Sequence, residues 1–162
     1  MFSPGILHSA EQILAKARAL RLKIGTAESC TGGLVAAAFT EIAGSSDVFE
    51  RGFVTYSNEA KQALLGVPGD LIGTYGAVSA EVARHMAEGV LAHAPVDLAV
   101  SITGVAGPGG GTAAKPVGLV HFAAVRRQGA LREDVARFGD LTRHEIRMRS
   151  VETALALLVG LL

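Results

Sequence analysis

The sequence predicts an α/β fold, namely a three-layer α/β/α sandwich in which helices cover both faces of a mixed sheet of about five strands. Segments with helical apolar periodicity alternate along the chain with short, strand-like apolar segments. The last two strand-like segments are separated by a short polar turn, which predicts an antiparallel pair. With 162 residues, close to the ~150 of a typical domain, we expect one domain over 1–162.

Composition excludes several classes of protein. Hydrophobic residues make up 49% of the chain and charged residues 19%, which excludes a disordered polyelectrolyte. Lys and Arg number 15, as do Asp and Glu, so no net field attracts nucleic acid or an anionic membrane. The single cysteine cannot form an internal disulfide, and from the sequence we expect neither a signal peptide nor a membrane-spanning segment. We therefore expect a cytoplasmic protein that binds neither nucleic acid nor membrane directly.

The first half of the chain is expected to contain three helices and two strands. A capping box that begins at Ser9 predicts the start of the first helix, and 22–28 reads as a short strand. Residues 31–43 are apolar almost all round, as in a helix buried against a sheet. A second strand is expected at 52–56, followed by a short helix with Asn58 as its N-cap.

The second half begins with the clearest amphipathic pattern, which predicts a helix over 78–94 with Ser79 as N-cap. A buried strand at 97–103 then enters a glycine-rich loop. Segments 117–125 and 130–138 form the predicted hairpin. A capping box at Thr142 opens the last helix.

Candidate functional residues follow the strands. Ligands of open α/β sheets bind beyond the carboxyl ends of strands, and Ser29, Tyr56 and Thr103 occupy three such ends. After Ser29, the N–H groups of a starting helix would be free to bind a phosphate or an oxyanion. The alternative is an ordinary helix cap, with its glycines present for packing.

A base for Ser29 is available in Lys61, which we place in the first turn of its helix. That role requires the pKa of Lys61 to fall from its usual value of about 10.4; a solvated surface lysine is the alternative. Tyr56 could relay a proton or orient the pair. Cys30 competes for the role of nucleophile, because a helix N-terminus acidifies a thiol. Alternation along a strand predicts that only one of Ser29 and Cys30 faces the pocket.

Other ligand groups are less specific. The five histidines show no ligand spacing, so we predict no metal. The loop 103–112 lacks the ending of a P-loop but could form a wall over a sugar or ring. Arg143 and Arg147 stand one helical turn apart and could clamp a phosphate; a solvated helix face is the alternative.

Several motifs together resemble those of one protein family. They are TAESCTGG at 26–33, GSS at 44–46, RGFVTYSNEAK at 51–61, GAVS at 76–79, SITGVAGP at 101–108 and KPVG at 115–118. In this order they closely resemble the CinA C-terminal family, which includes nicotinamide mononucleotide deamidases. The resemblance runs from about residue 10 to the end. We expect only this module, without the molybdopterin-binding-like domain that precedes it in full-length CinA proteins.

The resemblance implies an amidohydrolase that converts nicotinamide mononucleotide to nicotinate mononucleotide and ammonia, which returns the pyridine nucleotide to NAD synthesis. It places the family's serine, lysine and tyrosine on Ser29, Lys61 and Tyr56, and it implies no metal or cofactor. A homodimer or higher homo-oligomer is also expected. The substrate-binding residues that we expect are Cys30, Thr31, Gly32, Gly33, Thr103, Gly104, Arg143 and Arg147.

The sequence departs from the family at one point. The usual Gly-Asp-Arg is replaced by Gly139-Asp140-Leu141-Thr142-Arg143, which leaves the register of the phosphate-binding arginine open. Two other functions also remain open. One is a non-catalytic nucleotide-binding or protein-interaction module of the competence-associated type, and the other is an amidase that depends on Cys30.

Overall fold

One mixed sheet of five strands in the order β2-β1-β3-β4-β5 forms the centre of the computed structural model, which describes residues 2–162. Strands β1, β2 and β3 are parallel, whereas β3, β4 and β5 are antiparallel neighbours, so the predicted hairpin is confirmed. The strands are β1 (Ile24–Glu28), β2 (Phe49–Val54), β3 (Leu98–Gly104), β4 (Leu119–Arg126) and β5 (Leu131–Arg137).

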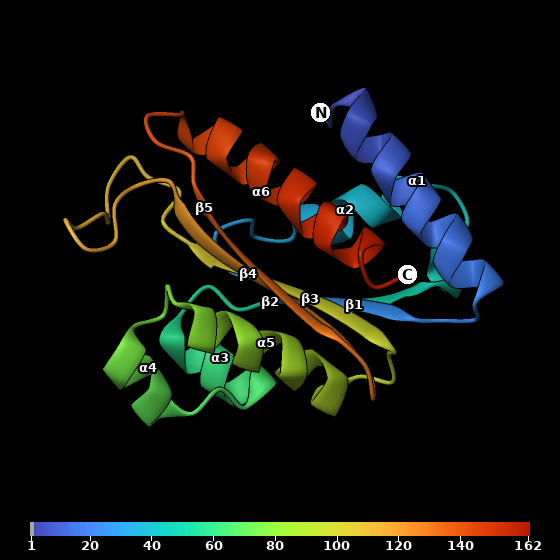
Figure 1. Cartoon of the computed structure of the whole chain (residues 1–162), viewed down its shortest axis with the longest axis horizontal. Helices are drawn as coiled ribbons and strands as arrows, with labels where there is room; N and C mark the ends of the chain where they lie inside the picture. The colour runs from blue at the N-terminus through green and yellow to red at the C-terminus, as the bar shows by residue number, and fades with distance from the viewer. Residues whose placement is uncertain (1) are drawn as a thin grey trace.

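Helices cover both faces of the sheet, which confirms the three-layer sandwich (Figure 1). One layer contains α1 (Pro4–Ala19), α2 (Leu34–Thr40) and α6 (Arg143–Val159). The other contains α3 (Asn58–Leu65), α4 (Gly69–Tyr75) and α5 (Ala80–His93). A single 3-10 turn, η1 (Ser45–Asp47), precedes β2.

Each face of the sheet has its own apolar core. On the α1, α2 and α6 face the core includes Phe39, Phe122 and Leu155. On the other face, Met86 and Val90 of α5 pack over the sheet. Strand β1 is buried along its whole length, whereas the edge strand β2 is partly exposed and the edge strand β5 largely exposed. Burial on both faces explains why β3, at the centre of the sheet, contains no charged residue.

The N-terminal elements differ from the predicted ones. Helix α1 begins at Pro4, because Ser3 caps it by accepting a hydrogen bond from the N–H of Ile6. The predicted start at Ser9 is therefore wrong, and proline at the first helical position fits the observed start. Helix α2 is shorter than 31–43, because the preceding residues form a turn that ends at Gly33, with φ +98°.

Around the second strand, the predicted element boundaries also differ from the observed ones. Strand β2 ends at Val54, so Tyr56 lies in the loop before α3 rather than on a strand. Ser57, not Asn58, caps α3 by accepting from the N–H of Ala60. The prediction missed helix α4, whereas the caps at Ser79 and Thr142 are confirmed.

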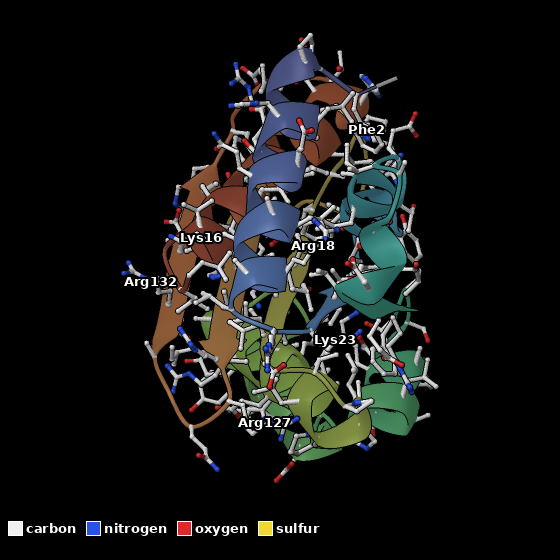
Figure 2. The ribbon with its side chains drawn as sticks, turned by 90° about the vertical axis from the view of Figure 1, so that its right-hand side faces the viewer. Phe2, Lys16, Arg18, Lys23, Arg127 and Arg132 are labelled. Atoms are coloured by element: carbon white, nitrogen blue, oxygen red, sulfur yellow. The ribbon has the colours of Figure 1, made fainter. Side chains whose placement is uncertain are left out.

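Arginine side chains tie helix ends to neighbouring loops (Figure 2). Arg18 of α1 contacts Asp47 of η1 with its Nε 2.5 Å from Oδ2. Arg127 donates to the carbonyl of Leu91, within the last turn of α5, and to that of Val96, beyond the helix. These contacts hold the end of the sheet that lies opposite the carboxyl ends of β1 and β3. Of the helices in residues 2–162, none is long and apolar enough to cross a membrane.

Candidate active site

A tight turn at the end of β1 presents Ser29. The N–H of Ser29 donates to the carbonyl of Ile102 on β3 at 2.9 Å, which ties the turn to the centre of the sheet. The N–H of Gly32 returns to the Ser29 carbonyl at 3.0 Å. Gly32 and Gly33 have φ values of +59° and +98°, a conformation that favours glycine. The turn therefore needs glycine at both positions to lead from β1 into α2.

Glu28, which the sequence did not identify, fixes the other side of this turn. Its carboxylate is buried, with the residue 1% exposed, and accepts from the N–H groups of Gly33, Val35 and Ala36 at 2.9–3.0 Å. A carboxylate at a helix N-terminus is favoured by the orphan donors and by the dipole. These N–H groups of α2 are therefore occupied, and the prediction that they are free for a phosphate is wrong.

Lys61 of α3 reaches across the end of the sheet to Ser29. The residue is 2% exposed, its Nζ lies 3.1 Å from Ser29 Oγ, and it donates to the carbonyl oxygen of Thr55 at 2.8 Å. It is therefore not a solvated surface lysine. Burial lowers its pKa from the ordinary lysine value, because desolvation penalises the ammonium form. Within residues 2–162 no carboxylate forms an ion pair with Lys61.

A neutral amine can make both contacts of Lys61 Nζ. One N–H donates to the Thr55 carbonyl, and the lone pair is available to the hydroxyl hydrogen of Ser29 at the observed separation of 3.1 Å. An amine in this state can take the proton of Ser29 when the hydroxyl attacks an electrophile. The pair therefore has the geometry of a nucleophile and its general base.

Cys30 is adjacent to Ser29 but chemically different. The thiol is 5% exposed, and burial raises its pKa to about 12. The expectation that a helix N-terminus acidifies it is wrong, because desolvation outweighs the nearby positive charges and Glu28 takes up the N–H groups of α2. Both Ser29 and Cys30 border the cavity described below. Strand alternation does not separate them, since both lie in the turn.

An open cavity of about 300 Å³ lies in front of Ser29. Gly104 at the end of β3 and the glycine loop after it form one wall, so the loop is placed where the sequence suggested a wall over a ligand. The cavity is lined by Ser29, Cys30, Tyr56, Val78, Gly104, Val105, Ala106, Gly107, Gly109, Gly110 and Arg143.

Arg143 bridges the mouth of this cavity. Its Nη1 donates to the carbonyl of Gly107 at 2.7 Å and its Nη2 to the hydroxyl of Tyr56 at 2.6 Å. Tyr56 is 61% exposed, and its hydroxyl contacts neither Ser29 nor Lys61 among the hydrogen bonds of residues 2–162. In this structure Tyr56 is thus a partner of Arg143 at the rim rather than of the reacting pair.

Arg147, one turn further along α6, is directed to the Ser29 turn. Its Nε donates to the carbonyl of Cys30 at 3.1 Å and its Nη2 to the carbonyl of Thr31 at 2.9 Å. Unlike Arg143, it does not line the cavity. The two arginines, which the sequence grouped as a clamp, therefore contact different parts of the site.

Two further candidate residues, Thr103 and Thr31, do not line the cavity. Thr103 is 1% exposed and donates its hydroxyl to the carbonyl of Ala77 at 2.7 Å, so it supports the wall without lining it. Thr31 is buried, and its hydroxyl has no partner among residues 2–162. Over the same residues, no group of three or more His, Cys, Asp or Glu side chains is placed to hold a metal ion.

The turn also offers backbone donors. Among the hydrogen bonds of residues 2–162, the N–H groups of Cys30 and Thr31 donate to no acceptor, whereas those of Gly32 and Gly33 are both used. Free N–H groups one and two residues after a nucleophilic serine have the position of oxyanion-hole donors.

Comparison with known proteins identifies similar sequences. The family model of the CinA C-terminal domain matches residues 7–162. A nicotinamide-nucleotide amidohydrolase PncC of Enterobacter agglomerans is 52% identical over 134 residues, which cover 80% of each chain. A competence-damage inducible protein of Caldicellulosiruptor bescii is 55% identical over 102 residues, 63% of this chain but 25% of that relative. The chain therefore matches only a small part of such longer relatives.

Solved structures with similar folds carry competence-related names. The competence/damage inducible protein CihA of Agrobacterium tumefaciens superposes with a TM-score of 0.98 at 50% identity, covering 99% of this chain and 98% of that chain. A CinA superfamily protein of Escherichia coli gives 0.91 at 34% identity, with coverages of 97% and 90%.

Proposed function

Because the chain belongs to the CinA C-terminal domain family, we propose that it is an amidohydrolase that converts nicotinamide mononucleotide to nicotinate mononucleotide and ammonia. The observation that carries this proposal is the separation of 3.1 Å between the buried Nζ of Lys61 and the Oγ of Ser29. The relative of Enterobacter agglomerans named as a nicotinamide-nucleotide amidohydrolase supports the substrate class.

In the proposed acylation step, Ser29 Oγ forms a bond with the carboxamide carbon while its proton passes to Lys61 Nζ. The carbonyl oxygen becomes an oxyanion and accepts a hydrogen bond from the N–H of Thr31. The C–N bond then breaks, and the leaving nitrogen takes the proton from Lys61 and departs as ammonia. A lowered pKa of Lys61 is essential for this step, because only the free amine can accept the first proton.

Deacylation reverses the roles of the groups. Water attacks the acyl carbon and gives a proton to Lys61 Nζ, which returns it to Ser29 Oγ as the ester bond breaks. The carboxylic acid that forms gives its proton to solvent or to the released ammonia, so nicotinate mononucleotide leaves as the carboxylate and the resting pair is restored. Lys61 carries each proton that moves between Ser29, the leaving nitrogen and the attacking water. The scheme therefore requires no metal, and activity should survive treatment with EDTA.

We place the substrate phosphate beside Arg143. This arginine lines the cavity, and its guanidinium can exchange the neutral acceptors Gly107 and Tyr56 for a phosphate, with which it makes stronger charge-assisted hydrogen bonds. Tyr56 would remain at the rim as a second donor to the phosphate or ribose. The open glycine wall leaves room for the sugar beside Gly104 and Gly107.

The test is an assay of ammonia and nicotinate mononucleotide with the wild type and two variants. We expect turnover that Ser29→Ala abolishes and Cys30→Ala retains, because the neutral, buried thiol takes no part. If Cys30→Ala abolishes turnover and Ser29→Ala does not, the cysteine-dependent amidase is correct. If the folded wild type binds the nucleotide without turnover, the protein is a binding module, the alternative left open by the sequence.

A further inference from the structure

Arg147 makes an unusual pair of contacts for a side chain beside an active site. Its two donors bind consecutive backbone carbonyls, those of Cys30 and Thr31, at 3.1 and 2.9 Å. The guanidinium is planar, and its Nε and Nη2 hydrogens point in nearly the same direction. Arg147 therefore holds both carbonyls on one side of the turn.

The orientation of the carbonyls determines where the following N–H groups point. A peptide unit is planar and trans, so its C=O and N–H bonds are antiparallel. With the Cys30 carbonyl held toward α6, the N–H of Thr31 is turned away from Arg147. The N–H of Gly32 is already used by the Ser29 carbonyl. Within residues 2–162 the turn therefore keeps two free donors, the N–H of Thr31 in the peptide unit that Arg147 fixes and the N–H of Cys30 in the unit before it.

Glu28 supports the same turn from its other end. It binds the N–H groups of Gly33, Val35 and Ala36, whereas Arg147 binds carbonyls that precede them in the chain. The turn is thus held between an anion on β1 and a cation on α6, and neither side chain lines the cavity. Such rigid support is what a preorganised donor requires, because a donor that must reorient during the reaction stabilises charge poorly.

We propose that Arg147 is a positioning residue that holds the Cys30–Thr31 peptide unit, and with it the free N–H groups of Cys30 and Thr31, in place for the oxyanion formed on attack by Ser29. This inference rests on the proposed amidohydrolase function. It assigns Arg147 to the transition state and Arg143 to the phosphate of the substrate, which separates two arginines that stand one turn apart. A lysine cannot replace Arg147, because a single ammonium does not bind two carbonyls with fixed geometry.

The first arm of the test compares kcat and KM for two substrates, nicotinamide mononucleotide and its phosphate-free riboside. For Arg147→Met we expect kcat to fall by ~10²–10³-fold, the loss typical of one oxyanion donor, by the same factor on both substrates and with little change in KM. Arg147→Lys should recover only a small part of kcat. Arg143→Met should instead raise KM for the mononucleotide by a larger factor than for the riboside, because only the mononucleotide carries the phosphate.

A matched control is available on the same helix. Arg149 of α6 is exposed and, within residues 2–162, forms an ion pair with Glu152 alone, so Arg149→Met should leave both kinetic constants unchanged. Thermal unfolding of all variants verifies that they fold. A rise in KM for the mononucleotide alone in Arg147→Met, with kcat unchanged, would show that Arg147 binds phosphate and would overturn the inference.

A second arm does not depend on the substrate. A fluorophosphonate labels an activated serine when Oγ bonds to phosphorus, fluoride leaves, and the serine proton passes to the base, here Lys61. The phosphoryl oxygen occupies the oxyanion site, so Arg147→Met should label at least ~10-fold more slowly than Arg149→Met. A wild type that is labelled but does not hydrolyse the nucleotide would contradict the proposed function alone. Equal labelling of the two variants would contradict the role of Arg147.

Discussion

Lys61 is the residue on which the chemistry of the site depends most. An ammonium in its position would be desolvated, since the residue is 2% exposed, and it would face the neutral oxygens of Thr55 and Ser29. The pKa of Lys61 is lowered for this reason. Because catalysis uses the free amine, kcat/KM should rise with pH through this lowered pKa and reach its plateau below the ordinary lysine pKa of about 10.4.

The lowered pKa of Lys61 also predicts how stability depends on pH. A folded pKa below the unfolded one means that the folded state binds fewer protons, so stability rises with pH between the two values. The cost of burying the charge is fully present below the folded pKa. Lys61→Met removes this cost, so the variant should be more stable than the wild type at low pH, with the difference shrinking as pH approaches 10.

The measurement is the free energy of unfolding in urea across this pH range, together with activity. We expect the Lys61→Met variant to lose activity by ~10²–10⁴-fold, the usual contribution of a general base. A stability difference that is independent of pH would mean that Lys61 titrates alike in both states. That result would contradict the lowered pKa.

At the scale of single elements, α3 has to be placed so that its lysine reaches Ser29. Helix α5 sets this position through Gly89, where a Cβ atom would lie 2.2 Å from the carbonyl oxygen of Leu65 at the end of α3. The two helices can approach this closely only because the residue at the crossing has no side chain. The lysine is therefore positioned through backbone contact between α3 and α5.

Gly89→Ala should push α3 away from the sheet and move Lys61 with it. We expect a loss of ~1–3 kcal/mol in the free energy of unfolding, as for other overpacking changes. Activity should fall by up to ~10²-fold, because misplacement of a catalytic group by ~1 Å can have such an effect. Urea denaturation and the product assay measure the two effects.

Gly73→Ala on α4 is the matched control. A Cβ at Gly73 would meet no atom within 4 Å, and alanine favours a helix over glycine by ~0.5–1 kcal/mol. This variant should therefore be as stable as the wild type or more so. An equal loss of stability in both glycine variants would show that close approach of α5 to α3 is not the cause.

Elements with strong local signals could be predicted from the sequence. The Ser79 and Thr142 caps and the hairpin of β4 and β5 depend on neighbouring residues, and all three are confirmed. Helix α4 was missed because it has only seven residues, two of them glycine, and no apolar periodicity. The start of α1 was misplaced because Ser3 and Ser9 are both plausible caps.

In the candidate site, too, some residues could be predicted from the sequence and others could not. Sequence reasoning found Ser29 and Lys61 from their places at a strand end and in a helix turn, and the structure brings them together. It missed Glu28 because a buried carboxylate that accepts from α2 is visible only in three dimensions. It also grouped Arg143 with Arg147, since helical spacing gives no information about which loop each guanidinium contacts.

At the scale of the whole molecule, the site joins segments that are distant in the chain. Ser29 follows β1, Lys61 comes from α3 on one face of the sheet, and Arg143 from α6 on the other. A nucleotide in the cavity would bridge the Ser29 turn, the glycine loop and α6. Binding should consequently stabilise the fold as a unit, whatever the oligomeric state, which stays a prediction from the sequence.

Nicotinate mononucleotide, the proposed product, should therefore raise the melting temperature. At 100 times its dissociation constant a ligand adds ~2.7 kcal/mol, which corresponds to ~5–10 °C for a domain of this size. The shift should be smaller for Arg143→Met at the same ligand concentration. A wild type whose melting temperature is unaffected by saturating nucleotide would contradict the placement of the ligand in this cavity.

The most direct test of the reacting pair is to trap the acyl intermediate. Acid quenching during turnover of nicotinamide mononucleotide, followed by peptide mass mapping, should find the nucleotide as an ester on Ser29 in the wild type and in Cys30→Ala. The adduct should be absent in Ser29→Ala and strongly reduced in Lys61→Met. An adduct on Cys30 in the wild type would contradict the assignment of Ser29 and Lys61 as nucleophile and base.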